Sequence, residues 1–212
     1  MEKDYLNLIR NAAFPEGDLG AEMIEGMNRG HSDLTDWGFS HVKFGNRILD
    51  VGCGGGAALA KLAIQFPNAH LAGCDISPLA VESAQKINEQ AVAAGRMELK
   101  LSGVPHLDYP DNSFDTVYSV ESLYFWQDAV AGLKDILRVL APGGTFMTVL
   151  EMVGGNMSDH HEEIAKELNM FCPTPEELGQ IVQHAGFIDI SLDEDREKGW
   201  ICITAKKPWF EA

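Results

Sequence analysis

The chain has few basic residues, and this shortage excludes several classes of partner. Lysine and arginine account for 16 of 212 residues against 32 aspartates and glutamates, so the formal net charge is −16. Such a surface repels phosphate groups unless basic side chains gather locally. The tightest basic cluster, Lys206-Lys207, is too short for a nucleic-acid footprint. We therefore expect no nucleic-acid or membrane partner, and a small molecule as the favoured substrate.

Long apolar runs are also lacking. No stretch reaches the roughly 20 apolar residues of a membrane span, and the N-terminus has no basic region followed by an apolar run. The length suits one domain. We accordingly expect a cytoplasmic protein that is a monomer or a homodimer.

The four cysteines (Cys53, Cys74, Cys172 and Cys202) show neither CxxC spacing nor a close pairing with histidine of the zinc type. His160-His161 is a poor metal pair, because adjacent helical residues point about 100° apart. The sequence therefore predicts no metal site.

From Arg47 onward, short apolar strands alternate with amphipathic helices. Strands are expected over 48–51, 69–74, 97–101, 114–120 and 145–150, and helices over 57–66, 78–94, 129–140 and 175–185. Such alternation is typical of a parallel sheet covered on both faces. Two final strands, 187–192 and 200–205, are joined by a polar turn and predict a hairpin. The expected fold class is α/β: a doubly wound, mostly parallel seven-stranded sheet with a C-terminal antiparallel hairpin and helices on both faces.

Residues 1–45 differ from this pattern and are expected to form a helical lid beside the substrate, whereas 46–212 form the main domain. Apolar residues recur at helical spacing over 19–27, and Gly30 ends that pattern. Ser32 or Asp33 is expected to cap the next short helix.

The strongest motif is the segment 48–56, where an apolar strand ends in Asp50 and Val51 and continues as GxGGG. Glycines after a first strand let the backbone turn sharply and let a ligand approach the peptide groups. The N-terminus of the next helix offers free N–H groups to an anionic ligand group. The strand, the loop and the helix thus follow one another in the order that is typical of sites for nucleotide-like ligands.

Asp75, at the end of the second strand, predicts a ribose site. A carboxylate at this position can accept both hydroxyls of a nucleoside held over the sheet. The alternative is that Asp75 caps the next helix, but Ser77 before Pro78 suits that role better.

Residues 47–151 resemble a class I, Rossmann-like S-adenosylmethionine-dependent methyltransferase of the small-molecule group (type 11/25-like). The resemblance is carried by the segments 49–56, 73–77, 110–115 and 137–144. It extends to the last helix and the hairpin, over 174–178 and 185–187.

This resemblance implies S-adenosylmethionine as the cofactor and S-adenosylhomocysteine as the product. Asp50, Gly52, Cys53 and Gly54 would hold the amino-acid end of the cofactor. Asp75 would bind the ribose, and Ile76 would pack on the adenine. The family often has an acid after the third strand that contacts the adenine. This chain has Ser102, Gly103 and Val104 there, so main-chain groups or Ser102 would take that role.

The segment 120–128 follows the fourth strand and, in the family, runs between cofactor and acceptor. Glu121 would lie beside the sulfonium and is a candidate general base, because nothing structural requires a charge at a strand end. Tyr124 and Trp126 would shape an acceptor pocket, although the aromatic residues of this segment could equally pack the following helix. His31 is a candidate base on the lid, and Glu151, past the fifth strand, is a candidate acceptor contact.

The predicted activity is methyl transfer to an unidentified small molecule. Two alternatives stay open. One is a protein that binds S-adenosylmethionine without catalysis. The other is an NAD(P)-dependent dehydrogenase, which the GxGGG spacing and the terminal hairpin disfavour.

Overall fold

A computed structural model describes residues 3–209. Met1 and Glu2, which begin the segment without a secretory pattern, lie outside the described residues. Seven strands form one sheet in the order β3-β2-β1-β4-β5-β7-β6. The strands are β1 (Arg47–Val51), β2 (His70–Asp75), β3 (Met97–Leu101), β4 (Phe114–Val120), β5 (Leu140–Leu150), β6 (Ile188–Asp195) and β7 (Trp200–Lys206).

The first five strands pair parallel with one another, and β7 pairs antiparallel with both β5 and β6. This confirms the predicted doubly wound sheet with a C-terminal hairpin. The helical elements are α1 (Lys3–Ile9), α2 (Gly17–Gly30), α3 (Ser32–Ser40), α4 (Ala57–Gln65), α5 (Pro78–Ile87), α6 (Glu89–Ala93), the 3-10 turn η1 (Leu123–Phe125), α7 (Ala129–Val139), α8 (Asp159–Glu167) and α9 (Pro175–His184). No helix within residues 3–209 has the length and apolar character needed to cross a membrane.

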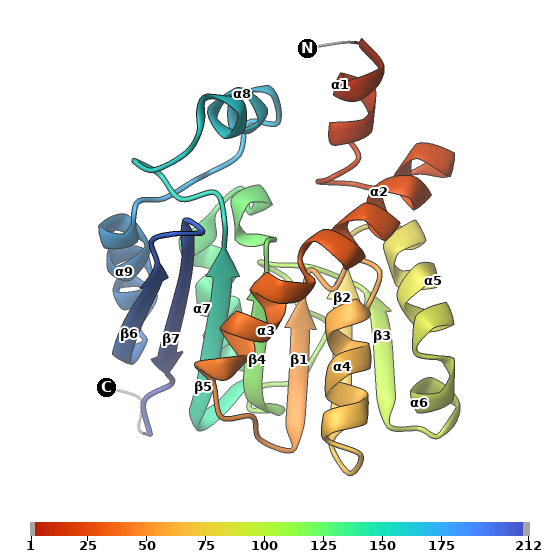
Figure 1. The fold of residues 1–212 in the computed structure, drawn as a ribbon. Coiled ribbons are helices and arrows are strands. Elements are labelled where there is room, and N and C mark those ends of the chain that lie inside the picture. The colour runs from red at the N-terminus through yellow and green to blue at the C-terminus, as the bar shows by residue number, and fades with distance from the viewer. Residues whose placement is uncertain (1–2, 210–212) are drawn as a thin grey trace.

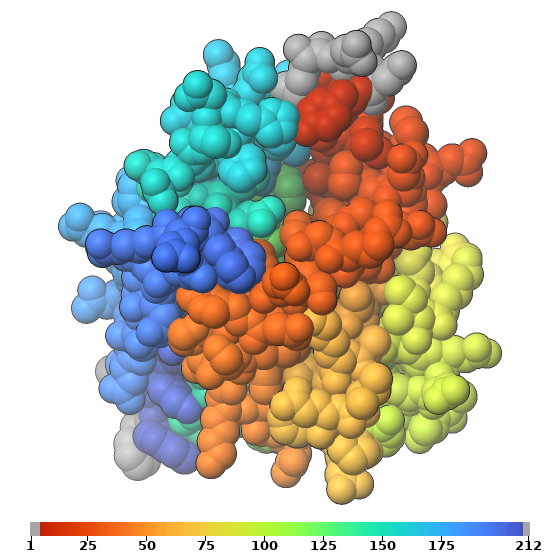
Figure 2. Space-filling model, in the orientation of Figure 1, coloured from red at the N-terminus to blue at the C-terminus, as the bar shows by residue number. Residues whose placement is uncertain are grey.

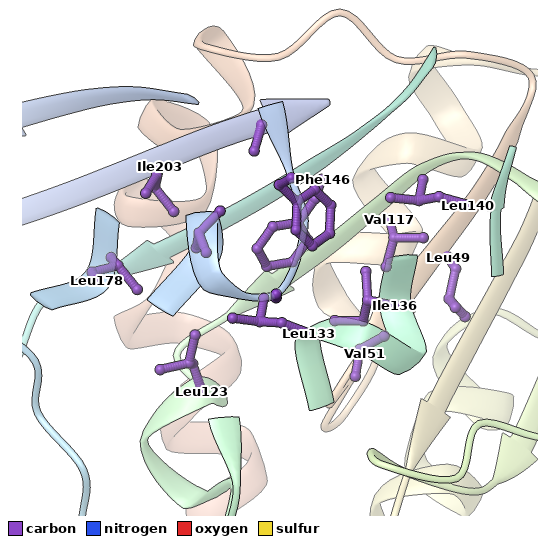
Figure 3. Close-up of a cluster of buried hydrophobic side chains, with 14 of the residues drawn as sticks. Leu49, Val51, Val117, Leu123, Leu133, Ile136, Leu140, Phe146, Leu178 and Ile203 are labelled. Carbon is purple, nitrogen blue, oxygen red and sulfur yellow. The ribbon is translucent and has the colours of Figure 1, made fainter. Parts of the chain in front are cut away.

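Side-chain alternation along β1 sets the two faces of the sheet, and helices lie over both faces (Figure 1). Leu49 and Val51 join the larger core cluster, together with side chains of α7 and α9. Ile48 joins the second cluster, with side chains of α3 and α4. Figure 3 shows the larger cluster, in which Leu133 and Ile136 of α7 lie close to the strand residues. Both faces are thus covered, as a parallel sheet requires.

Three local expectations were wrong. The predicted helix 78–94 is broken into α5 and α6 at Asn88, whose buried amide donates to the carbonyls of Gly56 and Ala84. The fifth strand begins at Leu140 rather than at Thr145, because Leu140 already pairs with Phe114. Neither Ser32 nor Asp33 caps α3, which starts at Ser32 after His31 and has no side-chain cap.

The carboxyl ends of β1, β2, β4 and β5 share one edge of the sheet, and α1, α2 and α8 lie above that edge (Figure 1). Figure 2 shows the N-terminal segment, in red and orange, beside the segment around α8, in cyan. Arg10 donates to Glu167 of α8, and the Tyr5 hydroxyl lies 3.1 Å from Nε2 of His160. The N-terminal helices therefore reach across the ligand edge to α8.

Candidate active site

A cavity of about 420 Å³ opens at this edge of the sheet, a size usual for small-molecule sites. Its walls come from the N-terminal segment, the glycine-rich loop, the ends of β2 and β3, and the segment after β4. They include Met27, Asn28, His31, Asp50, Gly52, Cys53, Gly54, Asp75, Ile76, Ser102, Gly103, Val104, Glu121, Phe125, Trp126 and Asp128. The cavity therefore gathers most of the residues that the sequence singled out.

The glycine-rich loop is held open by its backbone. The N–H groups of Gly52 and Cys53 both donate to the Cys74 carbonyl, which fixes the loop to β2. Gly52, Gly54 and Gly56 all have positive φ, which glycine adopts without strain. A Cβ on Gly54 would meet no atom within 4 Å. A ligand can therefore approach the backbone at Gly54.

Cys53 contributes little chemistry of its own. Burial raises the pKa of its thiol, so the sulfur stays protonated and is a poor nucleophile.

Asp50 is the least satisfied polar group of the site. Its side chain is 2% exposed, and Oδ1 has no hydrogen-bond partner among the described residues. Burial raises the pKa of Asp50 to about 8; the neighbouring Tyr118 hydroxyl opposes this shift, and the charge of Asp75 adds to it. An unpartnered buried carboxyl beside a cavity costs stability unless a ligand supplies a donor or a positive charge.

Asp75 is positioned by the backbone on both sides. Oδ2 accepts from the Gly54 N–H at 2.9 Å, and Oδ1 accepts from the Ser77 N–H at 2.9 Å. Ser77 caps α5, as predicted, by accepting from the Ala80 N–H. Each carboxylate oxygen of Asp75 keeps a free lone pair toward the cavity. Asp75 thus connects the glycine-rich loop, at Gly54, to the segment before α5, at Ser77.

The wall near Ile76 lacks a free side-chain donor. The Ser102 hydroxyl donates to the His106 carbonyl and accepts from the Asp108 N–H, so its only proton is used within its own loop. Ile76 is 53% exposed although it is apolar. This wall offers an apolar surface and main-chain polar groups, as suits a planar heterocycle.

Glu121 adopts a left-handed conformation with φ +56°, which is uncommon for residues other than glycine and marks functional sites. Its Oε1 accepts from the Tyr124 hydroxyl at 2.8 Å and from the Glu151 N–H at 2.7 Å. Burial, and to a lesser extent the charge of Glu151, raise the pKa of Glu121 to about 8.

Tyr124 lies behind Glu121 rather than in the cavity wall. It is 2% exposed, and its hydroxyl also accepts from the Met152 N–H. Trp126 does line the cavity. Of the two predicted acceptor aromatics, the structure therefore exposes only Trp126 to a ligand.

The structure brings three separately predicted residues together. His31 lies at the junction of α2 and α3, Glu121 follows β4, and Glu151 follows β5. His31 Nε2 is 3.8 Å from Glu151 Oε1, and ligand atoms of all three side chains lie within 4.8 Å of one another. Burial lowers the pKa of His31, which the charge of Glu151 opposes.

Sequence reasoning missed several residues of the cavity. Asn28 packs against Gly55, and Asp128 caps α7 through Oδ1 while lining the cavity. The resemblance placed the segment 120–128 beside the cofactor, but Asp128 received no role of its own, although an aspartate before a helical pattern signals a cap.

Comparison with known proteins agrees with this geometry. A family model described as a methyltransferase domain matches residues 49–148. The O-methyltransferase resE of Aspergillus sclerotiorum is 31% identical over 160 residues, 72% of this chain and 59% of that protein. Cycloartenol-C-24-methyltransferase 1 of Oryza sativa subsp. japonica is 33% identical over 80% of this chain and 49% of that protein. This chain therefore spans only about half to three fifths of these relatives.

A chain from the complex of the Haloferax volcanii Trm112 methyltransferase activator with a methyltransferase has the same fold. Its TM-score is 0.76 at 22% identity, and the match covers 87% of this chain and 93% of that one. The order of the strands and the match to this neighbour define a Rossmann-like fold. The chain belongs to the class I S-adenosylmethionine-dependent methyltransferase family.

Proposed function

We propose that this protein transfers a methyl group from S-adenosylmethionine to a small-molecule acceptor. The observation that carries the proposal is the pair of carboxylates at the glycine loop. The unpartnered Oδ1 of Asp50 suits a cationic ammonium group, and Asp75 suits a pair of hydroxyls. S-adenosylmethionine carries both: an ammonium group at its amino-acid end and the two ribose hydroxyls between the sulfonium and the adenine.

The other walls fit the same ligand. Gly54 leaves room for close approach to the backbone, and Ile76 presents an exposed apolar side chain for the adenine. Main-chain groups of Ser102, Gly103 and Val104 would read the adenine edge, since the Ser102 proton is already used. The carboxylates of Asp50 and Asp75 and the accessible backbone at Gly54 therefore fit the proposed cofactor.

Glu121, His31 and Trp126 line the part of the cavity assigned to the sulfonium and the acceptor. Bound S-adenosylmethionine supplies a methyl group on a sulfonium: the acceptor atom bonds to the methyl carbon, and the carbon–sulfur electron pair returns to sulfur, leaving S-adenosylhomocysteine. Glu121 would attract the positive charge. The lid of residues 1–45 would exclude water and orient the acceptor.

Calorimetric titration of the protein with S-adenosylmethionine, S-adenosylhomocysteine and NADH tests the cofactor class. Micromolar binding of both adenosyl ligands without NADH is expected, and binding of NADH alone would overturn the proposal. Turnover with a panel of small acceptors then separates an enzyme from a protein that only binds the cofactor.

Replacing Asp75 with alanine should weaken S-adenosylmethionine binding about 10- to 100-fold, because hydrogen bonds to a charged group contribute about 1.5–3 kcal/mol. Glu98→Ala on the neighbouring strand is the matched control, since Glu98 is 61% exposed and lies outside the cavity. An unchanged dissociation constant for Asp75→Ala would remove Asp75 from the ligand site.

The composition supports three further parts of the proposal: a cytoplasmic location, a monomer or homodimer, and no nucleic-acid partner. The net charge of −16 supports the last of these.

A further inference from the structure

The cluster of His31, Glu121 and Glu151 has the composition of a metal site. One imidazole nitrogen and two carboxylate oxygens converge within 4.8 Å, from positions far apart in the sequence. Zinc–nitrogen and zinc–oxygen bonds of about 2.0–2.2 Å place ligand atoms about 3–4 Å apart around one ion. The 3.8 Å between His31 Nε2 and Glu151 Oε1 already lies in that range.

Hydrogen bonds to one oxygen fix the Glu121 carboxylate and leave its other oxygen available to a metal ion. Its Oε1 is used by the Tyr124 hydroxyl and by the Glu151 N–H. Its Oε2 makes no hydrogen bond with the described residues, and Glu121 lines the cavity. These contacts fix the orientation of the carboxylate, as the supporting hydrogen bonds of metal ligands do.

The charges of the cluster are uncompensated. Within residues 3–209, neither Glu121 nor Glu151 forms an ion pair with a lysine or arginine, and the ion-pair partner of Glu151 is His31. Two neighbouring carboxylates in a partly buried position repel each other. A divalent cation would neutralise both acids and lie among the three ligand atoms, which are within 4.8 Å of one another.

We propose that His31, Glu121 and Glu151 bind a first-row divalent transition-metal ion. Imidazole with carboxylates favours Mn²⁺, Fe²⁺ or Zn²⁺ over Mg²⁺ and Ca²⁺, which prefer oxygen ligands alone. Three protein ligands leave coordination positions open toward the cavity, the arrangement of catalytic rather than structural sites.

The role of this ion rests on the proposed function. A metal beside the transferred methyl group would bind an acceptor oxygen and lower its pKa. The acceptor hydroxyl would release its proton to solvent, and its oxygen would bond to the methyl carbon while the carbon–sulfur pair returns to sulfur. The metal site thus selects hydroxyl-bearing acceptors and makes the expected reaction an O-methylation.

The test uses the full chain stripped with a chelator and titrated calorimetrically with MnCl₂, ZnCl₂ and MgCl₂. One ion per chain is expected for Mn²⁺ and Zn²⁺, with Mg²⁺ at least tenfold weaker. His31→Ala and Glu151→Gln should each weaken binding at least tenfold, since losing one ligand removes a strong metal bond. His184→Ala, which removes an exposed histidine at the end of α9, is the control and should bind normally.

Two further measurements keep the result clear if a variant folds poorly. Circular dichroism checks the fold of each variant, and the visible spectrum of the Co²⁺-loaded wild type reports imidazole ligation directly. Absence of stoichiometric binding by the wild type, or binding that the folded His31 and Glu151 variants retain, would overturn the metal site.

The same preparations keep the two proposals separate. S-adenosylmethionine binding without any metal binding would overturn the metal site alone and leave His31 and Glu121 as the general bases that the sequence predicts. Metal binding that depends on His31, in a protein that binds no adenosyl ligand, would support the metal site and overturn the proposed cofactor.

Discussion

Asp50→Asn should make the ligand-free protein more stable while removing most of its affinity for S-adenosylmethionine. Asparagine has nearly the same shape but no charge to bury, and Oδ1 of Asp50 has no partner in the free protein. The variant keeps a buried polar amide but removes the carboxyl, whose ionisation is opposed by burial. Each kcal/mol gained in this way raises the melting temperature by roughly 2–4 °C for a chain of this size. The cationic end of the cofactor would lose its counter-charge, so affinity should fall.

The stability gain of Asp50→Asn should depend on pH. The pKa of Asp50 is about 8 in the folded protein against 3.8 for the free side chain. The folded state therefore holds a proton that the unfolded chain releases. That contribution is complete below about pH 4 and is lost as pH rises through 8.

Melting temperatures at pH 5 and pH 9 measure this effect, and the gap between variant and wild type should be wider at pH 9. Asp135→Asn is the control, because Asp135 is also buried but accepts from the Leu107 N–H and from Arg138, so its loss should destabilise. A gap that is the same at both pH values would contradict the assigned charge state of Asp50.

Gly52→Ala should damage the glycine loop far more than Gly54→Ala. A Cβ on Gly52 would clash with the Ser122 Oγ, and that hydroxyl is held by the Val51 carbonyl and by Ser119. Positive φ costs about 1–2 kcal/mol for alanine, and overpacking adds about 1–3 kcal/mol. Gly54 has positive φ too, but a Cβ there meets no atom within 4 Å.

Urea unfolding of the two variants separates strain from crowding. Gly52→Ala should lose about 2–5 kcal/mol of unfolding free energy and Gly54→Ala about 1–2 kcal/mol. Adding Ser122→Gly to Gly52→Ala should recover part of the loss. Equal losses for the two single variants would show that the Ser122 contact is not what restricts position 52.

The sequence predicts the sheet well because periodicity and turn residues act locally. The bounds expected for β3 and β4 agree with the structure, since both strands are bounded by turn residues. The break between α5 and α6 was missed because it depends on Asn88 reaching Gly56, 32 residues away in the sequence. A hydrogen bond between residues so far apart in the sequence does not alter the local apolar periodicity from which helices are predicted.

The candidate site, like the fold, has a part that the sequence predicts and a part that it does not. Asp50, the glycine loop and Asp75 lie at the ends of two neighbouring strands, so a motif can predict their meeting, and their roles toward the cofactor stay predictions. His31, Glu121 and Glu151 were chosen one at a time, for separate reasons. They come together because β4 and β5 are neighbours in the sheet and because the junction of α2 and α3 lies over the ends of these strands. The spacing of residues in the sequence does not predict this arrangement.

Glu121 also bears on how new acceptors can be accommodated. Tyr124, which orients Glu121, is fixed through main-chain groups: its hydroxyl accepts from the Met152 N–H, and its carbonyl accepts from the Phe171 N–H. The Gly154 N–H likewise donates to the Pro173 carbonyl. Substitutions between 155 and 170 can therefore alter α8 and the loops beside it without removing these main-chain anchors. Under the proposed function, acceptor selectivity would diverge through this variable segment while Glu121 keeps its position.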